Sequence, residues 1–119
     1  YRTAFDDLVS PVFNRADPDL LIVSAGFDAH RHDPISRMHL STEGFGMLAE
    51  RVERLATETD AALAFVLEGG YSLDMLAEGV GTVHEVFDGY QPTDPEREAN
   101  DDARRIVDAA RSAHGLGSK

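Results

Sequence analysis

The sequence predicts an α/β fold built on a parallel sheet, and three observations support this prediction. Two apolar runs, 20–23 and 61–67, have the length and composition of buried strands. Between them, the segment 42–57 carries apolar side chains at helical spacing. Both runs lead into glycine-containing loops, 26–35 and 67–71. Strands joined by a helical crossover lie parallel, so both loops are expected at one edge of the sheet.

A helix is expected before the first strand, and a capped helix after it. The segment 3–16 places apolar residues at helical spacing, and Pro11 implies a kink or a first-turn position there. The polar segment 17–19 then ends the helical pattern. Ser41 or Thr42 is expected to cap the crossover helix, because a side-chain oxygen can accept a free N–H of the first turn.

Two more helices are expected after the second strand. Ser72 is placed to cap a helix, and the apolar face of that helix consists of Leu73, Leu76, Val80 and Val83. After Phe87 the composition becomes turn-rich and then, over 94–102, mostly charged. A last helix is expected within 96–113, with a thin apolar stripe that either packs on the domain or stays free.

Composition sets the class of protein. The chain has 119 residues with 42% apolar content, which suits one small globular domain, and no apolar run approaches a membrane span, so we expect a cytoplasmic protein. There is no cysteine, so a metal would have to be held by His, Asp or Glu. The net charge of -11 opposes direct binding to nucleic acid or to an anionic membrane, and favours a basic partner.

The two loops carry the residues that suggest chemistry. The first, 26–35, is dense in groups that bind divalent metals or move protons, namely Asp28, His30, His32 and Asp33. In the second, paired glycines let the backbone approach a ligand closely and project Tyr71 from a tight turn. From composition alone two interpretations stay open. Either the first loop binds a metal by itself, or Asp28 caps a turn, the histidines are solvated and Tyr71 is a packed aromatic.

Taken together, the two motifs resemble the last active-site segments of the histone deacetylase superfamily. The motifs are Ser24-Ala25-Gly26-Phe27-Asp28-Ala29-His30 with Asp33-Pro34, and Leu67-Glu68-Gly69-Gly70-Tyr71. The similarity is closest to the class II and prokaryotic branches, which include acetylpolyamine amidohydrolases and acetoin-utilisation proteins. It covers about 1–90 and implies the carboxy-terminal part of an arginase/deacetylase-like three-layer fold. The remaining 91–119 would then form an acidic, partly helical extension.

The resemblance implies a role for several residues. Asp28 corresponds to the carboxylate ligand of a catalytic Zn²⁺, which polarises an acetyl carbonyl and its bound water. Tyr71 corresponds to the tyrosine whose hydroxyl donates to that carbonyl oxygen as negative charge develops. The positions that line the tunnel for the acyl-lysine stem and border its floor are Pro34, Ile35, Gly69 and Gly70. At the position of Ile35, polyamine-selecting members can carry an acidic residue, so the aliphatic side chain favours an acetyl-lysine-like substrate.

The sequence also departs from the family. Glycine is common where His32 stands, and the paired histidines and the Asp-x-His segment that complete the active site are expected before Tyr1. We therefore expect a fragment that binds zinc poorly, is inactive alone and self-associates through exposed apolar surface. Two alternatives remain. One is a non-enzymatic, acidic interaction module, and the other is a different metallohydrolase that uses Asp28, His30, His32 and Asp33.

Overall fold

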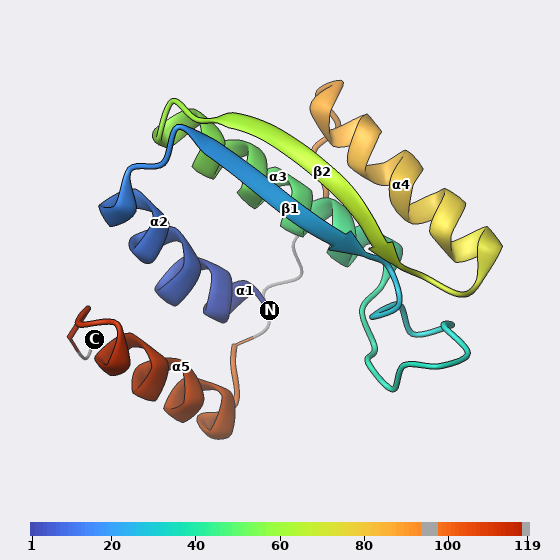
Figure 1. The fold of residues 1–119 in the computed structure, drawn as a ribbon. Coiled ribbons are helices and arrows are strands. Elements are labelled where there is room, and N and C mark those ends of the chain that lie inside the picture. The colour runs from blue at the N-terminus through green and yellow to red at the C-terminus, as the bar shows by residue number, and fades with distance from the viewer. Residues whose placement is uncertain (94–97, 118–119) are drawn as a thin grey trace.

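The computed structural model describes residues 1–93 and 98–117, and its centre is a two-stranded parallel sheet (Figure 1). Strand β1 spans Leu20–Gly26 and strand β2 spans Ala62–Gly69, and helix α3, at Thr42–Glu58, forms the crossover between them. The strands pair in register from Leu20 opposite Ala62 to Gly26 opposite Gly69. The predicted parallel pair is therefore confirmed, with both strands longer at their carboxyl ends than the apolar runs suggested.

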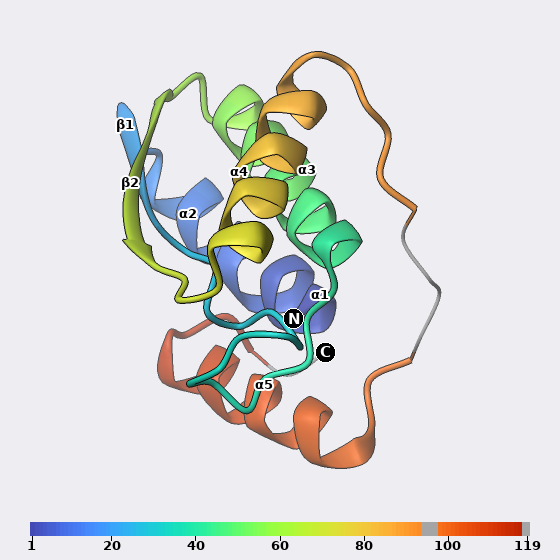
Figure 2. The ribbon, with the colours of Figure 1, turned by 90° about the vertical axis from the view of Figure 1, so that its right-hand side faces the viewer.

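The two helices that follow the predicted serine caps begin where expected. Helix α3 is capped by Ser41, whose hydroxyl accepts the N–H of Gly44 at 3.1 Å. Helix α4, at Leu73–Phe87, follows Ser72, but the Ser72 side chain makes no capping hydrogen bond. Helix α4 packs along α3, and Figure 2 shows both helices on the same side of the sheet. These contacts fix the start of α4, and with it the loop that carries Tyr71.

The amino-terminal helix is continuous but irregular. It consists of α1 at Arg2–Ala4, a π-helical turn η1 at Phe5–Val9, and α2 at Ser10–Ala16. Pro11 lies in the first turn of α2, directly after the wider turn. Because proline has no N–H, the carbonyl four residues before it, that of Asp7, cannot receive the usual helical bond from this position. The predicted disturbance at Pro11 is thus present as a π-turn.

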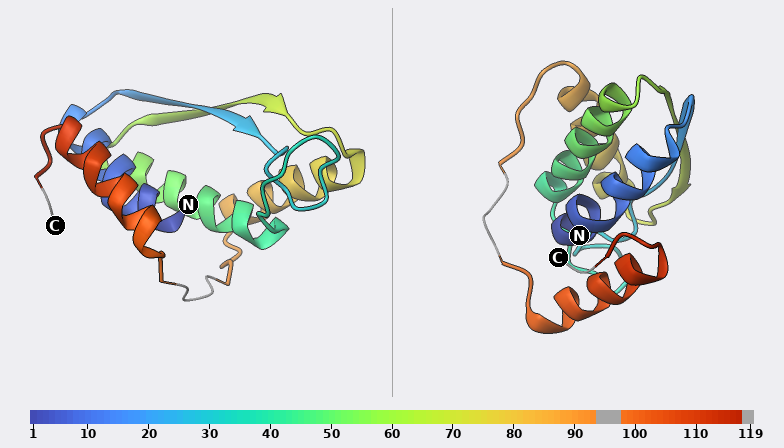
Figure 3. Two further views of the ribbon diagram at one scale, coloured as in Figure 1. Left: turned by 90° about the horizontal axis from the view of Figure 1, so that it is seen from below. Right: turned by 90° about the vertical axis from the view of Figure 1, so that its left-hand side faces the viewer.

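The sheet is covered on one face only. Leu21 packs with Leu55 and Ala56 of α3, and this cluster is the core between sheet and helices. On the opposite face Ile22 is 63% exposed and Val66 is 48% exposed. Figure 3 shows the helices gathered on one side of the strands. The expectation that both strands are buried on both faces is wrong for these residues, because no segment among those described covers the outer face.

The last helix is shorter than predicted and packs on the domain. Helix α5 spans Asp101–Ala113, and the side chain of Asn100 accepts the N–H of Ala103 at 2.8 Å as its cap. Positions 96 and 97 of the predicted helix lie outside the described residues. Helix α5 contacts α1 and η1, and Val107 is buried in that contact. Val107 of the predicted apolar stripe therefore packs on the first helix, whereas Ile106 of the same stripe is 65% exposed.

Candidate active site at the carboxyl ends of the strands

The two motif loops leave the sheet side by side. Gly26 and Gly69 are paired at the ends of β1 and β2, and the N–H of Phe27 donates to the carbonyl of Gly69 at 2.8 Å. A register irregularity lies between Ala25 and Gly26, at the end of β1. The predicted meeting of both loops at one edge of the sheet is confirmed.

Phe27 anchors the first loop in the protein core. Its side chain is 5% exposed, and its ring centroid lies 5.1 Å from that of Phe45 on α3. On the other side it presses against Gly79 of α4, where a Cβ atom would overlap the ring. Burying Phe27 therefore fixes the start of the turn that carries Asp28.

Asp28 lies against the end of the neighbouring strand. A Cβ atom at Gly69 would come within 3.3 Å of the Asp28 carboxyl group, and one at Gly26 within 3.2 Å. Its carboxylate, half-buried, accepts no hydrogen bond from any residue in 1–93 or 98–117. Burial, followed by the charge of Asp28, raises the pKa of Tyr1. Sequence reasoning did not connect Tyr1 with this site. Asp28 is therefore a carboxylate whose oxygens remain available.

Asp33 connects the two loops through its carboxylate. One oxygen accepts the N–H groups of Ile35 at 2.8 Å and Ser36 at 3.1 Å, and the other accepts the N–H of Tyr71 at 2.9 Å. The residue is only 8% exposed. Burial alone would raise its pKa, but the three N–H donors and the nearby His30 outweigh burial and hold the pKa of Asp33 below its usual value.

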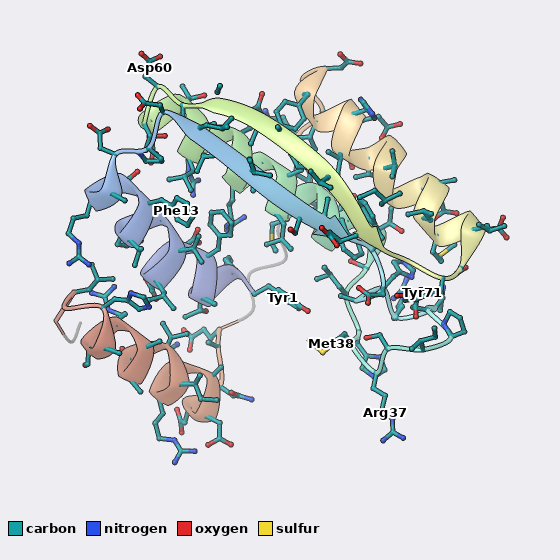
Figure 4. All side chains as sticks on the ribbon, viewed as in Figure 1. Tyr1, Phe13, Arg37, Met38, Asp60 and Tyr71 are labelled. Atoms are coloured by element: carbon teal, nitrogen blue, oxygen red, sulfur yellow. The ribbon has the colours of Figure 1, made fainter. Side chains whose placement is uncertain are left out.

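Tyr71 projects from the second loop, as its sequence predicted. Gly70, before it, has φ of +128°, a backbone conformation that favours glycine. The Tyr71 side chain is 55% exposed, so it is not a packed core aromatic. In Figure 4 it lies beside the loop that extends to Arg37 and Met38. Within the described part of the chain, no hydrogen bond holds its hydroxyl.

The two histidines have different environments. His30 is 2% exposed; its Nδ1 accepts the N–H of His32 at 3.1 Å, and its Nε2 lies 3.2 Å from the hydroxyl of Thr42. Burial, followed by the charges of His32 and Arg31, lowers the pKa of His30. His30 is thus a neutral, hydrogen-bonded structural residue. His32 is exposed, with its ring centroid 5.2 Å from that of His30.

The metal-binding interpretation of the first loop alone finds no support in this geometry. Both nitrogens of His30 and both oxygens of Asp33 are occupied by other contacts. Across 1–93 and 98–117 there is no group of three or more His, Asp or Glu side chains arranged to hold a metal ion. Asp28 fits a single carboxylate ligand, since its oxygens accept no hydrogen bond from the described residues. The rest of such a site would have to come from other residues.

The predicted tunnel residues take different positions. Ile35 is 67% exposed, which excludes a side chain folded onto the core, and Pro34 beside it is also exposed. Gly69 faces Asp28, as described above. A Cβ atom at Gly70 would lie 3.2 Å from the Phe27 side chain and 3.1 Å from Leu76. Both glycines are therefore required by close packing around the loop that bears Asp28.

These loops belong to a known domain. Residues 1–87 match the family model described as histone deacetylase domain. The chain belongs to the histone deacetylase family. The resemblance inferred from the two motifs is therefore confirmed, and the family's α/β fold is the one that the parallel strands and helices form here.

Two relatives of this deacetylase-family chain are a plant histone deacetylase and a human polyamine deacetylase. It is 36% identical over 125 residues to "Histone deacetylase 10, chloroplastic" of Oryza sativa subsp. japonica, covering 97% of this chain and 28% of that protein. It is 41% identical over 80 residues to "Polyamine deacetylase HDAC10" of Homo sapiens, covering 67% of this chain and 12% of that protein. The chain thus spans a minor part of the length of these relatives.

Two solved structures share the fold of this deacetylase-family chain. One is the histone deacetylase Clr3, with a TM-score of 0.84 and 29% identity, covering 98% of this chain and 19% of that one. The other is the HDA15 HD domain, with a TM-score of 0.79 and 26% identity, covering 96% of this chain and 30% of that one. In the described part of the chain, no helix has both the length and the apolarity that crossing a membrane requires.

Proposed function

We propose that these residues form the carboxy-terminal part of a zinc-dependent deacetylase that hydrolyses an acetylated amine to acetate and the free amine. The observation that carries the proposal is the junction of the two loops. The N–H of Phe27 donates to the carbonyl of Gly69 at 2.8 Å, so the residues that follow, Asp28 and Tyr71, leave the same edge of the sheet. Ligands of open α/β sheets bind at this edge, outside the carboxyl ends of the strands.

Asp28 is the metal ligand in this proposal. Its carboxylate accepts no hydrogen bond from the described residues, and an oxygen ligand of this kind suits a divalent ion. Bound zinc supplies Lewis acidity towards an acyl carbonyl and a water molecule. Gly26 and Gly69 have no Cβ atom, which leaves room for the Asp28 carboxylate against the strand ends.

Tyr71 is the hydrogen-bond donor to the acyl oxygen. A tyrosine hydroxyl has a reference pKa near ~10, so it keeps its proton at neutral pH and can stabilise developing negative charge. Its exposure of 55% leaves it accessible to a substrate, and Gly70 sets the turn that projects it. Its hydroxyl is not committed to another contact within the described residues.

Ile35 and Pro34 are proposed to line the entrance for the substrate chain. Ile35 offers an exposed aliphatic side chain that contacts the methylene stem of an acylated lysine without attracting a second cationic amine. This favours an acetyl-lysine-like substrate, although one relative is a polyamine deacetylase. Gly69 and Gly70 are proposed to border the floor of that entrance.

The 119 residues alone are proposed to be inactive. Asp28 is one ligand of a site that needs about three protein ligands, so zinc affinity should be low without the rest of the domain. The exposed face around Ile22 and Val66 would favour self-association. We propose a cytoplasmic location. We also propose no direct contact to nucleic acid or membrane, because the net charge is -11.

Tyr71→Phe in the full-length protein tests the proposal. The change removes one hydroxyl, so kcat on an acetyl-lysine peptide should fall by about 10² to 10³ while bound zinc is unchanged. The matched control is Tyr90→Phe, because the Tyr90 hydroxyl donates a hydrogen bond to the carboxylate of Glu43 at 2.9 Å. Equal turnover in Tyr71→Phe and the unaltered protein would reject the role of Tyr71.

The same measurement distinguishes this proposal from the competing hypothesis, an acidic interaction module without activity. Its support is the net charge of -11, which favours a basic partner. That hypothesis predicts no turnover even in the full-length protein supplied with zinc. Hydrolysis that depends on Tyr71 excludes it.

A further inference from the structure

Asp33 is a buried carboxylate between two exposed residues. Its neighbours His32 and Pro34 are exposed, whereas Asp33 is 8% exposed. Burying a carboxylate is unfavourable unless its oxygens are hydrogen-bonded. Here both oxygens are used, and every donor is a backbone N–H. The side chain therefore organises the backbone of the two loops rather than contacting solvent.

The two oxygens of Asp33 have separate tasks. One closes a local turn by accepting the N–H groups of Ile35 and Ser36. The other crosses to the second loop, 38 residues away, and accepts the N–H of Tyr71 at 2.9 Å. A second hydrogen bond between the loops runs from the N–H of Phe27 to the carbonyl of Gly69. Of these, only the bond to Asp33 depends on a side chain.

The bond is made at the backbone of the residue proposed to act on the substrate. Tyr71 follows Gly70, whose φ of +128° is a backbone conformation that glycine adopts readily because it has no side chain. Within the described residues the Tyr71 hydroxyl has no hydrogen bond, and its side chain is 55% exposed. The place of the hydroxyl is therefore set through the backbone, and Asp33 holds that backbone.

We propose that Asp33 is a positioning residue that fixes Tyr71 relative to the loop bearing Asp28. This inference rests on the proposed function and adds a residue to it. A displacement of about 1 Å at a reacting group can cost roughly 10² in rate, so a single hydrogen bond at this point matters to turnover. Both oxygens of Asp33 are occupied by backbone N–H groups, so Asp33 acts through Tyr71.

Asp33→Asn separates the two tasks. An amide has one acceptor oxygen, so it can keep the local turn with Ile35 and Ser36 but then presents an NH₂ group to the N–H of Tyr71. In the full-length zinc protein we expect kcat to fall about 10- to 100-fold, with KM and bound zinc little changed. The matched control is Asp60→Asn, which removes the same charge at an exposed site; Figure 4 shows Asp60 and Tyr71 at opposite ends of the molecule.

The decisive readout is a double-mutant cycle with Tyr71→Phe. If Asp33 acts through the tyrosine hydroxyl, Asp33→Asn should change kcat less than about 2-fold once that hydroxyl is absent. The same fold-loss in both backgrounds would overturn the proposal and indicate a general structural role. An intact effect of Tyr71→Phe together with unchanged kcat in Asp33→Asn would overturn the positioning role while leaving the proposed function in place.

A backbone variant covers the case in which Asp33→Asn does not fold. Replacing Tyr71 by its α-hydroxy acid analogue exchanges the N–H for an ester oxygen and keeps the phenol and Asp33. Loss of kcat by about 10-fold or more, at normal zinc content, is expected. The corresponding ester at Tyr90 is the control, because the N–H of Tyr90 donates to the carbonyl of Glu85 outside the two loops. Equal turnover in the Tyr71 ester and the unaltered protein would overturn the proposal.

Discussion

At the scale of single residues, Gly79 determines how closely helix α4 approaches the loop that bears Asp28. A Cβ atom there would overlap the ring of Phe27, whereas one at Gly81, in the same helix, would have no atom within 4 Å. Gly79→Ala should therefore destabilise the protein by about 1–3 kcal/mol. Gly81→Ala should instead stabilise it by up to about 1 kcal/mol, because alanine is the better helix former.

Urea unfolding of the two variants checks this prediction. The expected result is a lower midpoint for Gly79→Ala and an equal or higher midpoint for Gly81→Ala, with similar slopes. Both variants add the same methyl group to the same helix, so only the contact with Phe27 differs. Equal midpoints would show that the ring of Phe27 moves aside without cost.

Sequence reasoning reached the proposed site residues but not the residues that hold them in place. Asp28 and Tyr71 were identified because their motifs are specific to a family, and the structure brings their loops together. The bridge from Asp33 to the backbone of Tyr71 spans 38 residues and leaves no pattern in a single sequence. The burial of His30 was missed for a related reason, since its packing against Phe45, at 6.2 Å between ring centroids, depends on a distant helix.

At the scale of elements, two arginines join helix α5 to the amino-terminal helix, one from each side of the contact. Arg111 of α5 donates to the carbonyl of Asp7, the group deprived of a helical donor by Pro11. Arg15 of α2 donates to the carbonyls of His114 and Gly115, just beyond the end of α5. Each arginine thus donates to backbone carbonyls of the other helix or of the residues just beyond its end.

Arg111→Met should loosen α5 without unfolding the domain. Methionine keeps the apolar stem but removes the guanidinium donors, so the hydrogen bonds of Arg111 to the carbonyls of Asp7 and Leu116 are lost at a cost of about 1–3 kcal/mol. Hydrogen exchange of the α5 amides should therefore accelerate about 5- to 150-fold, while exchange in β1 stays unchanged. Arg105→Met is the control, because the ion pair of Arg105 with Asp102 lies within the same helix and is exposed.

Equal exchange rates in the two variants would contradict the docking role of Arg111. The outcome also bears on the boundary predicted at about position 90. The periodicity of α5 indicated a helix, but the partner of its thin apolar stripe was not visible in the sequence. That partner is the first helix of the chain, which α5 contacts through Val107 and Arg111.

At the scale of the whole molecule, the fold was largely predictable and its solvent exposure was not. The order of strands and helices followed from two apolar runs and the helical spacing between them. Burial of both faces of the sheet could not be predicted in the same way, because it depends on a second layer, and no described segment covers the outer face. Ile22 and Val66 show this directly, since both are apolar strand residues in open contact with solvent.

The central claim is that Asp28 and Tyr71 serve one zinc site. A crystal structure of the full-length protein grown with zinc, with data collected at the zinc absorption edge, tests it most directly. The account predicts an anomalous peak about 2.0–2.2 Å from a carboxylate oxygen of Asp28, with the hydroxyl of Tyr71 facing the same cleft. Zinc bound by other residues, with Asp28 or Tyr71 turned away from it, would contradict the account.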